Sequence, residues 1–308
     1  MMVKITYVWC GSCGRKGAYS VPGRGVTRCR FCRALNPPLL GHPEEKEFHK
    51  ALERGELELV YQPEVVLPEG DLVGVEALLR WNRPERGVLP PAVFLRRAEE
   101  TGLIVPIGTW VLHEACRQAA RWRHEQSEEP ALAVSVNLSG RQFDSGLLET
   151  VASCLSATGL PTSLLRLEVT ESIFLGDVGS AARQLESLRE LGVKVTLDSF
   201  GGPDSSLNAL REFPVDFVKL DRSLLGDIEG NPRYLTILAG AVNLLNSLDL
   251  TVVAKGVERE AQLGQLHRLG CAMAQGNHFG PPLPPGLLAE LTRISGISPD
   301  SITEFPQF

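Results

Sequence analysis

Carboxylate and amide side chains recur at or near the ends of the apolar segments of this 308-residue chain. Each segment is a run of aliphatic residues of the kind that forms a buried strand. So many carboxylates in one place would repel one another unless a cation joined them, and oxygen ligands of this kind suit Mg²⁺ or Mn²⁺. In chain order the polar side chains are Glu76, Asn137, Glu168, Asp198, Lys219 with Asp221, Lys255 with Glu258, and Gln275.

The segment VVAKGVE, residues 252–258, differs from the others because it carries a cation where the pattern predicts an anion. Lys255 follows small and apolar residues, at a place where other segments present Glu, Asn or Asp. If these segments meet, Lys255 brings a positive charge among carboxylates. It then either neutralises one of them or repels a metal ion that they would bind.

Four cysteines near the N-terminus form a second chemical group. The sequences CGSC and CRFC are separated by fifteen residues, and two such pairs of thiolates are typical of a closed tetrahedral zinc site. Disulfides are the weaker interpretation for a chain that we predict to be cytoplasmic. The spacing therefore predicts a zinc-ribbon-like domain over residues 1–36 with the ligands Cys10, Cys13, Cys29 and Cys32.

The charge distribution separates this head from the rest of the chain. Residues 1–37 carry seven Lys and Arg and no Asp or Glu, although the net charge of the whole chain is −6. A basic head fits contact with nucleic acid or an acidic protein, or simply a solvated scaffold, and the sequence does not separate these. A Pro-rich linker follows at 37–45. No apolar run approaches the roughly 18 residues of a membrane helix, and the N-terminus lacks a signal-peptide core, so we expect no membrane contact.

The elements that would position the polar side chains alternate between strands and helices from residue 46 onward. Amphipathic helical patterns lie between the strands, as in residues 108–125 and 234–250. This alternation predicts a (β/α)8 barrel over 46–290 with a tail at 291–308, and a doubly wound open sheet is the runner-up. A barrel would bring the strand ends to one mouth. The candidate strands are 57–63, 72–81, 132–139, 164–172, 193–198, 215–221, 250–256 and a short one near 271–275.

Seven sequence motifs of this region resemble, in order, those of the EAL family, the cyclic di-GMP phosphodiesterases and their degenerate relatives. The resemblance covers roughly residues 46–290. It implies a modified (β/α)8 barrel whose first strand runs antiparallel to the others. It also implies linearisation of cyclic di-GMP to pGpG by two divalent cations, and pairing of two copies around the loop after the fifth strand. The motifs are VEALLRW, NLSGRQF, LEVTES, DSFGG, PVDFVKLDRS, GVE and QGNHF.

The resemblance also implies a role for each matching residue. Arg80 would contact a ligand phosphate through its bidentate guanidinium, and Glu171 would anchor the loop after the fifth strand. Lys219 and Asp221 would lie beside the attacking water, with Glu258 and Gln275 as supporting residues. Glu76, Lys255 and Gln275 would also line the ligand site. The first divalent cation, Mg²⁺ or Mn²⁺, would be held by Glu76, Asn137, Glu168 and Asp198.

The chain departs from the family at the second metal position. Ser199 and Lys255 stand where the family has Asp and Glu, and the loop that follows, with Gly202, Pro203 and Asp204, is also altered. A unit charge pair about 4 Å apart interacts by roughly 4 kcal/mol at an effective dielectric constant near 20, so Lys255 should repel a second divalent cation. The departures predict one metal ion instead of two.

Three functions follow from this pattern. The first is a cyclic di-GMP receptor with impaired hydrolysis, and the second is a slow phosphodiesterase. The third is a protein-interaction module that no longer binds nucleotide. The retained first-metal residues and Arg80 favour the receptor over the interaction module. The paired losses at 199 and 255 favour it over the slow enzyme.

Overall fold

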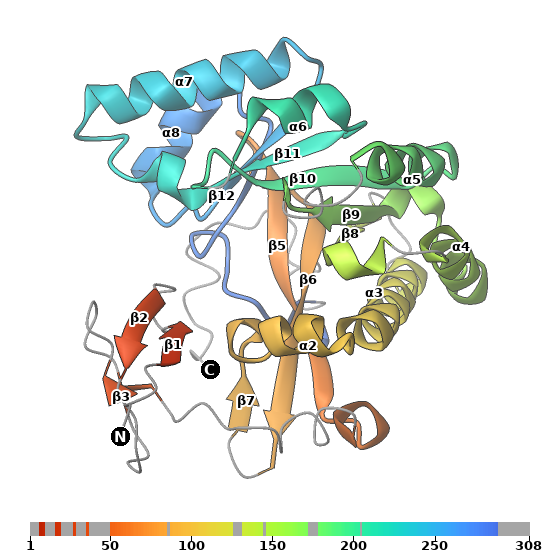
Figure 1. The fold of residues 1–308 in the computed structure, drawn as a ribbon. Coiled ribbons are helices and arrows are strands. Elements are labelled where there is room, and N and C mark those ends of the chain that lie inside the picture. The colour runs from red at the N-terminus through yellow and green to blue at the C-terminus, as the bar shows by residue number, and fades with distance from the viewer. Residues whose placement is uncertain are drawn as a thin grey trace. The chain divides into compact units, whose positions relative to one another are not determined.

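The computed structural model describes residues 50–84, 87–125, 131–143, 146–171, 178–203 and 205–288, together with four short strands within residues 6–36 (Figure 1). The predicted linker and tail lie outside the described residues, and so do the four cysteines of the predicted zinc site. The chain divides into two compact units. One contains residues 1–57 and 81–103, and the other contains residues 58–80 and 104–308.

The second unit is built on a closed sheet that confirms the predicted barrel. Neighbouring strands from β6 to β13 pair in parallel around the sheet. The first strand, β5, runs antiparallel to β13 and also pairs with β6, which closes the sheet. Closure excludes the open doubly wound sheet. The barrel strands are β5 (Leu57–Val66), β6 (Leu72–Arg83), β8 (Ala133–Asn137), β9 (Leu165–Val169), β10 (Lys194–Phe200), β11 (Phe217–Leu220), β12 (Thr251–Lys255) and β13 (Met273–Gln275).

The parallel strands are largely apolar because both of their faces are covered. Leu167, Leu197 and Val218 are fully buried, as expected for parallel strands with helices outside and side chains within. Figure 1 shows the helices arranged on the outside of the strands. They are α3 (Ile104–Glu125), α4 (Leu147–Thr158), α5 (Val178–Glu190), α6 (Leu207–Glu212), α7 (Pro232–Asn246) and α8 (Glu260–Arg268).

Short single-turn helices lie directly before or after several strands. η2 (Gly140–Gln142) follows β8, η3 (Thr162–Leu164) precedes β9, and η5 (Arg222–Leu225) follows β11. Ser139 begins η2 by accepting a hydrogen bond from the backbone of Arg141, and Asp221 begins η5 in the same way. Such capping fixes the direction in which the chain leaves the barrel.

The first unit contains two hairpins and a small apolar cluster. β1 (Thr6–Trp9) pairs with β2 (Lys16–Tyr19), and β3 (Thr27–Arg28) pairs with β4 (Leu35–Asn36), both antiparallel. Farther along, β7 (Gly87–Leu89), η1 (Pro91–Val93) and α2 (Leu95–Thr101) follow one another. Trp81 packs edge-on against Phe94, with ring centroids 5.7 Å apart, and its indole N–H donates to Glu56.

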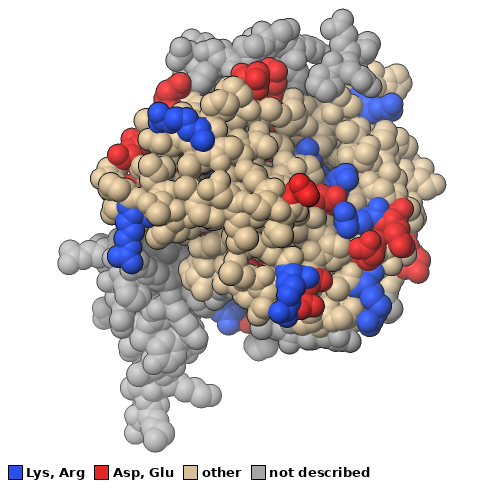
Figure 2. All heavy atoms as spheres, turned by 90° about the horizontal axis from the view of Figure 1, so that it is seen from above, with Lys and Arg blue, Asp and Glu red and all other residues tan. Residues whose placement is uncertain are grey.

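Charged side chains of both signs are interspersed on the face drawn in Figure 2. Among the described residues of that face, no extended surface of a single sign is seen. In the described part of the chain, no helix has the length and apolar composition needed to cross a membrane.

Candidate functional site

Three buried carboxylates surround the ammonium group of Lys219 on β11. Its Nζ lies 2.7 Å from Oε1 of Glu64 and 3.1 Å from Oε2 of Glu76, and it also pairs with Oε1 of Glu168. The Lys219 side chain is only 1% exposed. Burial alone would lower the pKa of Lys219, but Glu168, Glu64 and Glu76 outweigh it and raise that pKa well above its ordinary value. Lys219 is therefore a permanent cation inside the barrel.

Glu76, on β6, is held on both of its oxygens. Asn137 Nδ2 donates to Oε1 at 2.8 Å, and Gln275 Nε2 donates to Oε2 at 2.8 Å, beside the ion pair with Lys219. Burial would raise the pKa of Glu76, but Lys219, Lys255 and the two amides lower it to about 2. The carboxylate is ionised and its orientation is fixed by three different strands.

Glu168, on β9, is fully buried, and its two carboxylate oxygens differ in their contacts. Oε1 pairs with Lys219, whereas Oε2 has no hydrogen-bond partner among the described residues. Burial, followed by the charge of Glu76, raises the pKa of Glu168 to about 8. A buried oxygen without a donor is costly, so this position suits a proton or a bound cation.

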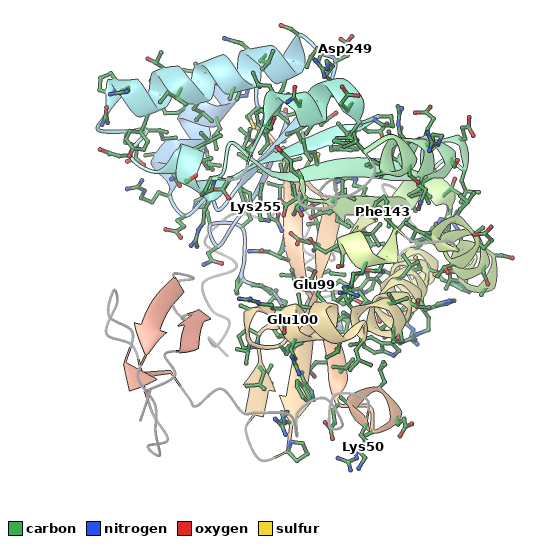
Figure 3. All side chains as sticks on the ribbon, in the orientation of Figure 1. Lys50, Glu99, Glu100, Phe143, Asp249 and Lys255 are labelled. Carbon is green, nitrogen blue, oxygen red and sulfur yellow. The ribbon has the colours of Figure 1, made fainter. Side chains whose placement is uncertain are left out.

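The strand ends β10 and β12 meet through a second ion pair. Lys255 Nζ donates to both oxygens of Asp198, at 2.9 Å and 2.8 Å, and its side chain is 32% exposed. Figure 3 labels Lys255 at the end of β12. The backbone N–H of Ser199 also donates to Asp198, and Ser199 has the left-handed φ of 60° that is uncommon outside glycine. The ammonium of Lys255 thus spans the carboxylate edge that a metal ion would use.

The end of β13 is tied to the end of β12. The carbonyl of Gln275 accepts hydrogen bonds from the backbone N–H groups of Gly256 and Val257, at 2.8 Å and 3.0 Å. A Cβ on Gly276 would lie 2.1 Å from the carbonyl oxygen of Val257, so only glycine allows this close approach. This contact places the Gln275 amide against Glu76.

Charge balance tests whether the site fits a divalent cation. With Glu64, Glu76, Glu168 and Asp198 all ionised, these four carboxylates face Lys219, Lys255 and Arg166 and leave one negative charge, which either a cation or a proton on Glu168 would neutralise. In the described ranges, no three His, Cys, Asp or Glu side chains are already arranged to hold a metal ion. The oxygens of Glu76, Asn137 and Glu168 suit one such ion, but Asp198 can join them only when Lys255 is displaced.

The remaining predicted site residues make their contacts elsewhere. Arg80 is half-buried, its Nη1 donates to the carbonyl of Leu79, and burial lowers its pKa. Asp221 accepts from the backbone of Ser223, and Glu258 is exposed. The structure joins Glu76, Asn137, Glu168, Lys219 and Gln275 in one network and pairs Asp198 with Lys255. The contacts recorded for Asp221 and Glu258 do not belong to that network.

Glu171 connects the end of β9 to the loop after β10. Its Oε1 accepts from the hydroxyl of Ser205 at 2.9 Å, and both of its oxygens accept from the backbone N–H of Ser206 at 2.7–2.8 Å. These hydrogen bonds tie Glu171 to the loop after β10.

Glu64 is the site residue that sequence reasoning missed. Besides Lys219, it accepts from Arg166 at 2.9 Å and from the Ser135 hydroxyl at 3.3 Å. The available signal was a carboxylate inside the apolar strand LELVYQPEVV, two residues after Gln62. Gln62 accepts a hydrogen bond from Gln275 at 3.3 Å, so both side chains belong to the interior face of β5.

The fold and this network together define an EAL domain. Residues 45–282 match the model of the EAL domain family, so the chain belongs to that family. It is 43% identical over 239 residues to MucR of Pseudomonas aeruginosa, a bifunctional diguanylate cyclase/cyclic di-GMP phosphodiesterase. The match covers 77% of this chain and 35% of the length of MucR.

Two solved structures have a similar barrel. The MucR phosphodiesterase in complex with c-di-GMP has a TM-score of 0.74 and 42% identity, covering 79% of this chain and 98% of that one. The EAL enzyme Bd1971, with cAMP and cyclic di-GMP bound, has a TM-score of 0.77 and 31% identity. That match covers 81% of this chain and 68% of Bd1971.

Proposed function

We propose that the barrel binds cyclic di-GMP at its mouth and hydrolyses it slowly or not at all, and so serves as a receptor in cyclic di-GMP signalling. The observation that carries this proposal is the grip of Lys255 on both oxygens of Asp198. A lysine is a point charge that can neutralise a phosphate without activating water. Two related EAL structures contain cyclic di-GMP, which supports cyclic di-GMP as the ligand of this barrel.

The chain's own residues would divide the work of binding. Asn137 and Gln275 orient Glu76, while Arg80 and Lys255 supply positive charge for the phosphates. EAL phosphodiesterases generally use Mg²⁺ or Mn²⁺. One such ion, held by Glu76, Asn137 and Glu168, and by Asp198 only once Lys255 is displaced, would polarise a phosphoryl oxygen. A second ion would lack the carboxylates that Ser199 and Lys255 replace.

A slow phosphodiesterase is the second candidate, and two observations favour it. Within the described part of the chain Glu168 Oε2 has no hydrogen-bond partner. The Lys255 side chain is one-third exposed, so Lys255 has room to leave Asp198. The residues Lys219 and Gln275 remain in place for such an enzyme. Turnover would then depend on displacement of Lys255 by a metal ion.

Calorimetric titration of the full chain with cyclic di-GMP, with and without Mg²⁺, tests the proposal, and chromatography follows pGpG in the same samples. We expect binding with negligible pGpG. The Glu76→Ala variant is the control, because it removes the hub of the network. Absence of binding would refute the receptor. Formation of pGpG by the wild type but not by Glu76→Ala would establish the slow enzyme instead.

We further propose that Cys10, Cys13, Cys29 and Cys32 bind one structural zinc ion. The described strands support this. In the first hairpin Trp9 pairs with Lys16, and in the second Arg28 pairs with Leu35, so six residues separate the strands in each. Each C-x2-C begins directly after the first strand of its hairpin. Two equivalent hairpins of this kind are typical of a zinc ribbon. The basic composition of this head fits nucleic acid or an acidic protein as its partner.

We also propose that two copies of the barrel pair. The family resemblance implies pairing around the loop after the fifth strand, and we extend the proposed interface to α7. α7 carries an exposed apolar stripe made by Tyr234, Ile237 and Leu244, which are 42%, 52% and 39% exposed. Residues spaced by three and seven lie on one face of a helix. Leu207, at the start of α6 and 64% exposed, adds to the apolar surface of this part of the chain.

A further inference from the structure

We infer that Glu64 is a positioning residue that holds the ammonium of Lys219 inside the barrel, so that Lys255 is the lysine that meets a ligand phosphate at the mouth. The first part stands on the contacts of Glu64 alone. The second part rests on the proposed binding of cyclic di-GMP.

The donors of Lys219 are fully used. An ammonium group has three N–H donors, and those of Lys219 face Glu64, Glu76 and Glu168. With 1% of its side chain exposed, Lys219 has neither a spare donor nor a route to solvent. It cannot donate to a phosphate or a water without giving up a carboxylate.

Glu64 is itself held firmly in place. Its Oε2 accepts from Arg166 Nη1 at 2.9 Å, and the guanidinium of Arg166 lies 4.5 Å from the ring centroid of Phe217. Gly74 leaves room for this carboxylate, because a Cβ there would lie 3.0 Å from Glu64 Oε2. Glu64 is fully buried, so its carboxylate has little freedom to move with Lys219 toward the mouth of the barrel.

Binding of a metal ion would leave this arrangement in place. A divalent cation would compete with Lys219 for Glu76 and Glu168, which belong to the predicted metal set. Glu64 does not belong to that set, and its carboxylate also accepts hydrogen bonds from Arg166 and Ser135. The 2.7 Å contact between Glu64 and Lys219 therefore keeps the ammonium in the interior whether or not a metal binds.

Lys255 has the opposite properties. Two hydrogen bonds to Asp198 leave one of its three donors for another partner. Its side chain is 32% exposed, against 1% for Lys219. Of these two lysines, only Lys255 can add a phosphate contact without breaking an existing one.

Nuclear magnetic resonance of the lysine ammonium groups in the full chain tests the role of Glu64 without any ligand. The variant is Glu64→Gln with Arg166→Met, which removes both partners of a buried pair and keeps the charge balance of the site. We expect proton exchange between the Lys219 ammonium and water to accelerate about tenfold or more, because one charge-assisted hydrogen bond is lost. Lys255→Gln assigns the Lys255 signal by its loss, and Lys219→Met assigns the Lys219 signal in the same way among the seven lysines of the chain.

Asp216→Asn is the matched control, since it removes an ion-paired carboxylate that does not contact Lys219. If exchange at Lys219 is the same in the Glu64 variant as in this control, Glu64 does not position Lys219. If the double variant fails to fold, the single change Glu64→Gln is measured in the same way.

Addition of cyclic di-GMP tests which lysine meets the ligand. In the wild type the Lys255 signal should shift and the Lys219 signal should not, whereas in the Glu64 variant both should shift. A wild-type Lys219 signal that moves as much as that of Lys255 overturns the inference. If calorimetry detects no binding, the proposed function fails, and the exchange measurement still decides the role of Glu64.

Discussion

Ser199 and Lys255 act on the same side chain, and this makes their effects inseparable. Ser199 donates its backbone N–H to Asp198, and Lys255 donates to both oxygens of that carboxylate. The two positions at which the family resemblance implies carboxylates therefore both contact one buried group. Lys255 is the counter-ion of Asp198, and Lys219 and Arg166 supply the positive charge for the other buried carboxylates of the barrel.

Restoring both carboxylates should restore hydrolysis, whereas restoring one should not. Ser199→Asp alone leaves Lys255 to repel a second cation, and Lys255→Glu alone leaves the set one ligand short. The double change should give pGpG formation on the order of tenfold or more above either single change, because the two positions share one ion. Chromatography of pGpG in Mg²⁺ or Mn²⁺ measures this.

Glu76→Ala in the double-variant background is the control, and it should abolish the recovered turnover. Additive effects of the two single changes would contradict a shared ion. The altered loop with Gly202 and Pro203 limits how far the rate can recover if it positions the ligand.

The residue types at the strand ends were sufficient to predict most of the network, but not its arrangement. Glu76, Asn137 and Glu168 were predicted together, and the structure joins Glu76 to Asn137 and, through Lys219, to Glu168. The carboxylate that Lys255 would neutralise was left open, because pairing across a barrel mouth depends on side-chain rotamers. Glu258 is exposed, whereas Asp198 is buried within reach.

Among the elements, β5 is a strand that hydrophobic periodicity predicts, although periodicity does not predict its direction in the sheet. Its existence and approximate bounds follow from its apolar pattern. Its direction was implied only by the family resemblance, and its direction sets the neighbours of Glu64. In the antiparallel register Glu64 lies opposite Gln275. Nothing in the local sequence of β5 encodes that neighbour, so the role of Glu64 could not be predicted.

Asp216 clamps three elements together at the start of β11. It accepts from the backbone N–H of Val195 at 3.0 Å, from Lys194 at 3.1 Å and from Arg189 of α5 at 3.3 Å. Burial opposes ionisation, but these hydrogen bonds lower the pKa of Asp216 below its ordinary value of 3.8. β10, β11 and α5 are therefore joined through one carboxylate.

Asp216→Asn should lower the free energy of unfolding by about 1 to 2 kcal/mol at pH 7. A carboxyl whose folded-state pKa is depressed stabilises the protein above its unfolded-state pKa, and this contribution is lost as the pH falls through the folded-state pKa. The difference between wild type and variant should thus be full above about pH 4 and shrink below it. Urea unfolding between pH 7 and pH 3 measures it. A difference that stays constant over this range would contradict the clamp.

At the scale of the whole molecule, the head and the barrel should respond separately to metal removal. Elemental analysis should find one zinc per chain, and Cys10→Ser with Cys13→Ser should abolish it. Chelation should unfold the head and leave the barrel folded, because small zinc domains depend on their metal. Near-ultraviolet circular dichroism and calorimetry follow the two parts. A preparation without zinc, or a serine variant that melts like the wild type, would exclude the site.

Assembly can be tested on the apolar stripe of α7. Ile237→Glu places a charge in the centre of the stripe and should shift a dimer to monomer in sedimentation equilibrium, by at least about tenfold in dissociation constant. Val105→Glu is the matched control, since Val105 is 40% exposed on α3 and outside the stripe. A wild-type monomer at all concentrations would rule out pairing.

The ion pair between Lys255 and Asp198 also changes what the site would sense in a cell. When a ligand binds together with a dissociable metal ion, the apparent binding constant of the ligand is proportional to the free metal concentration, once for each ion required. A lysine is part of the chain and is present at every ionic composition. Replacing one metal ion by Lys255 therefore removes one dependence of the binding constant on metal concentration. The fraction of this barrel that is occupied by nucleotide should therefore depend less on the cellular Mg²⁺ concentration than the occupied fraction of a two-metal relative does. It should depend mainly on the nucleotide concentration.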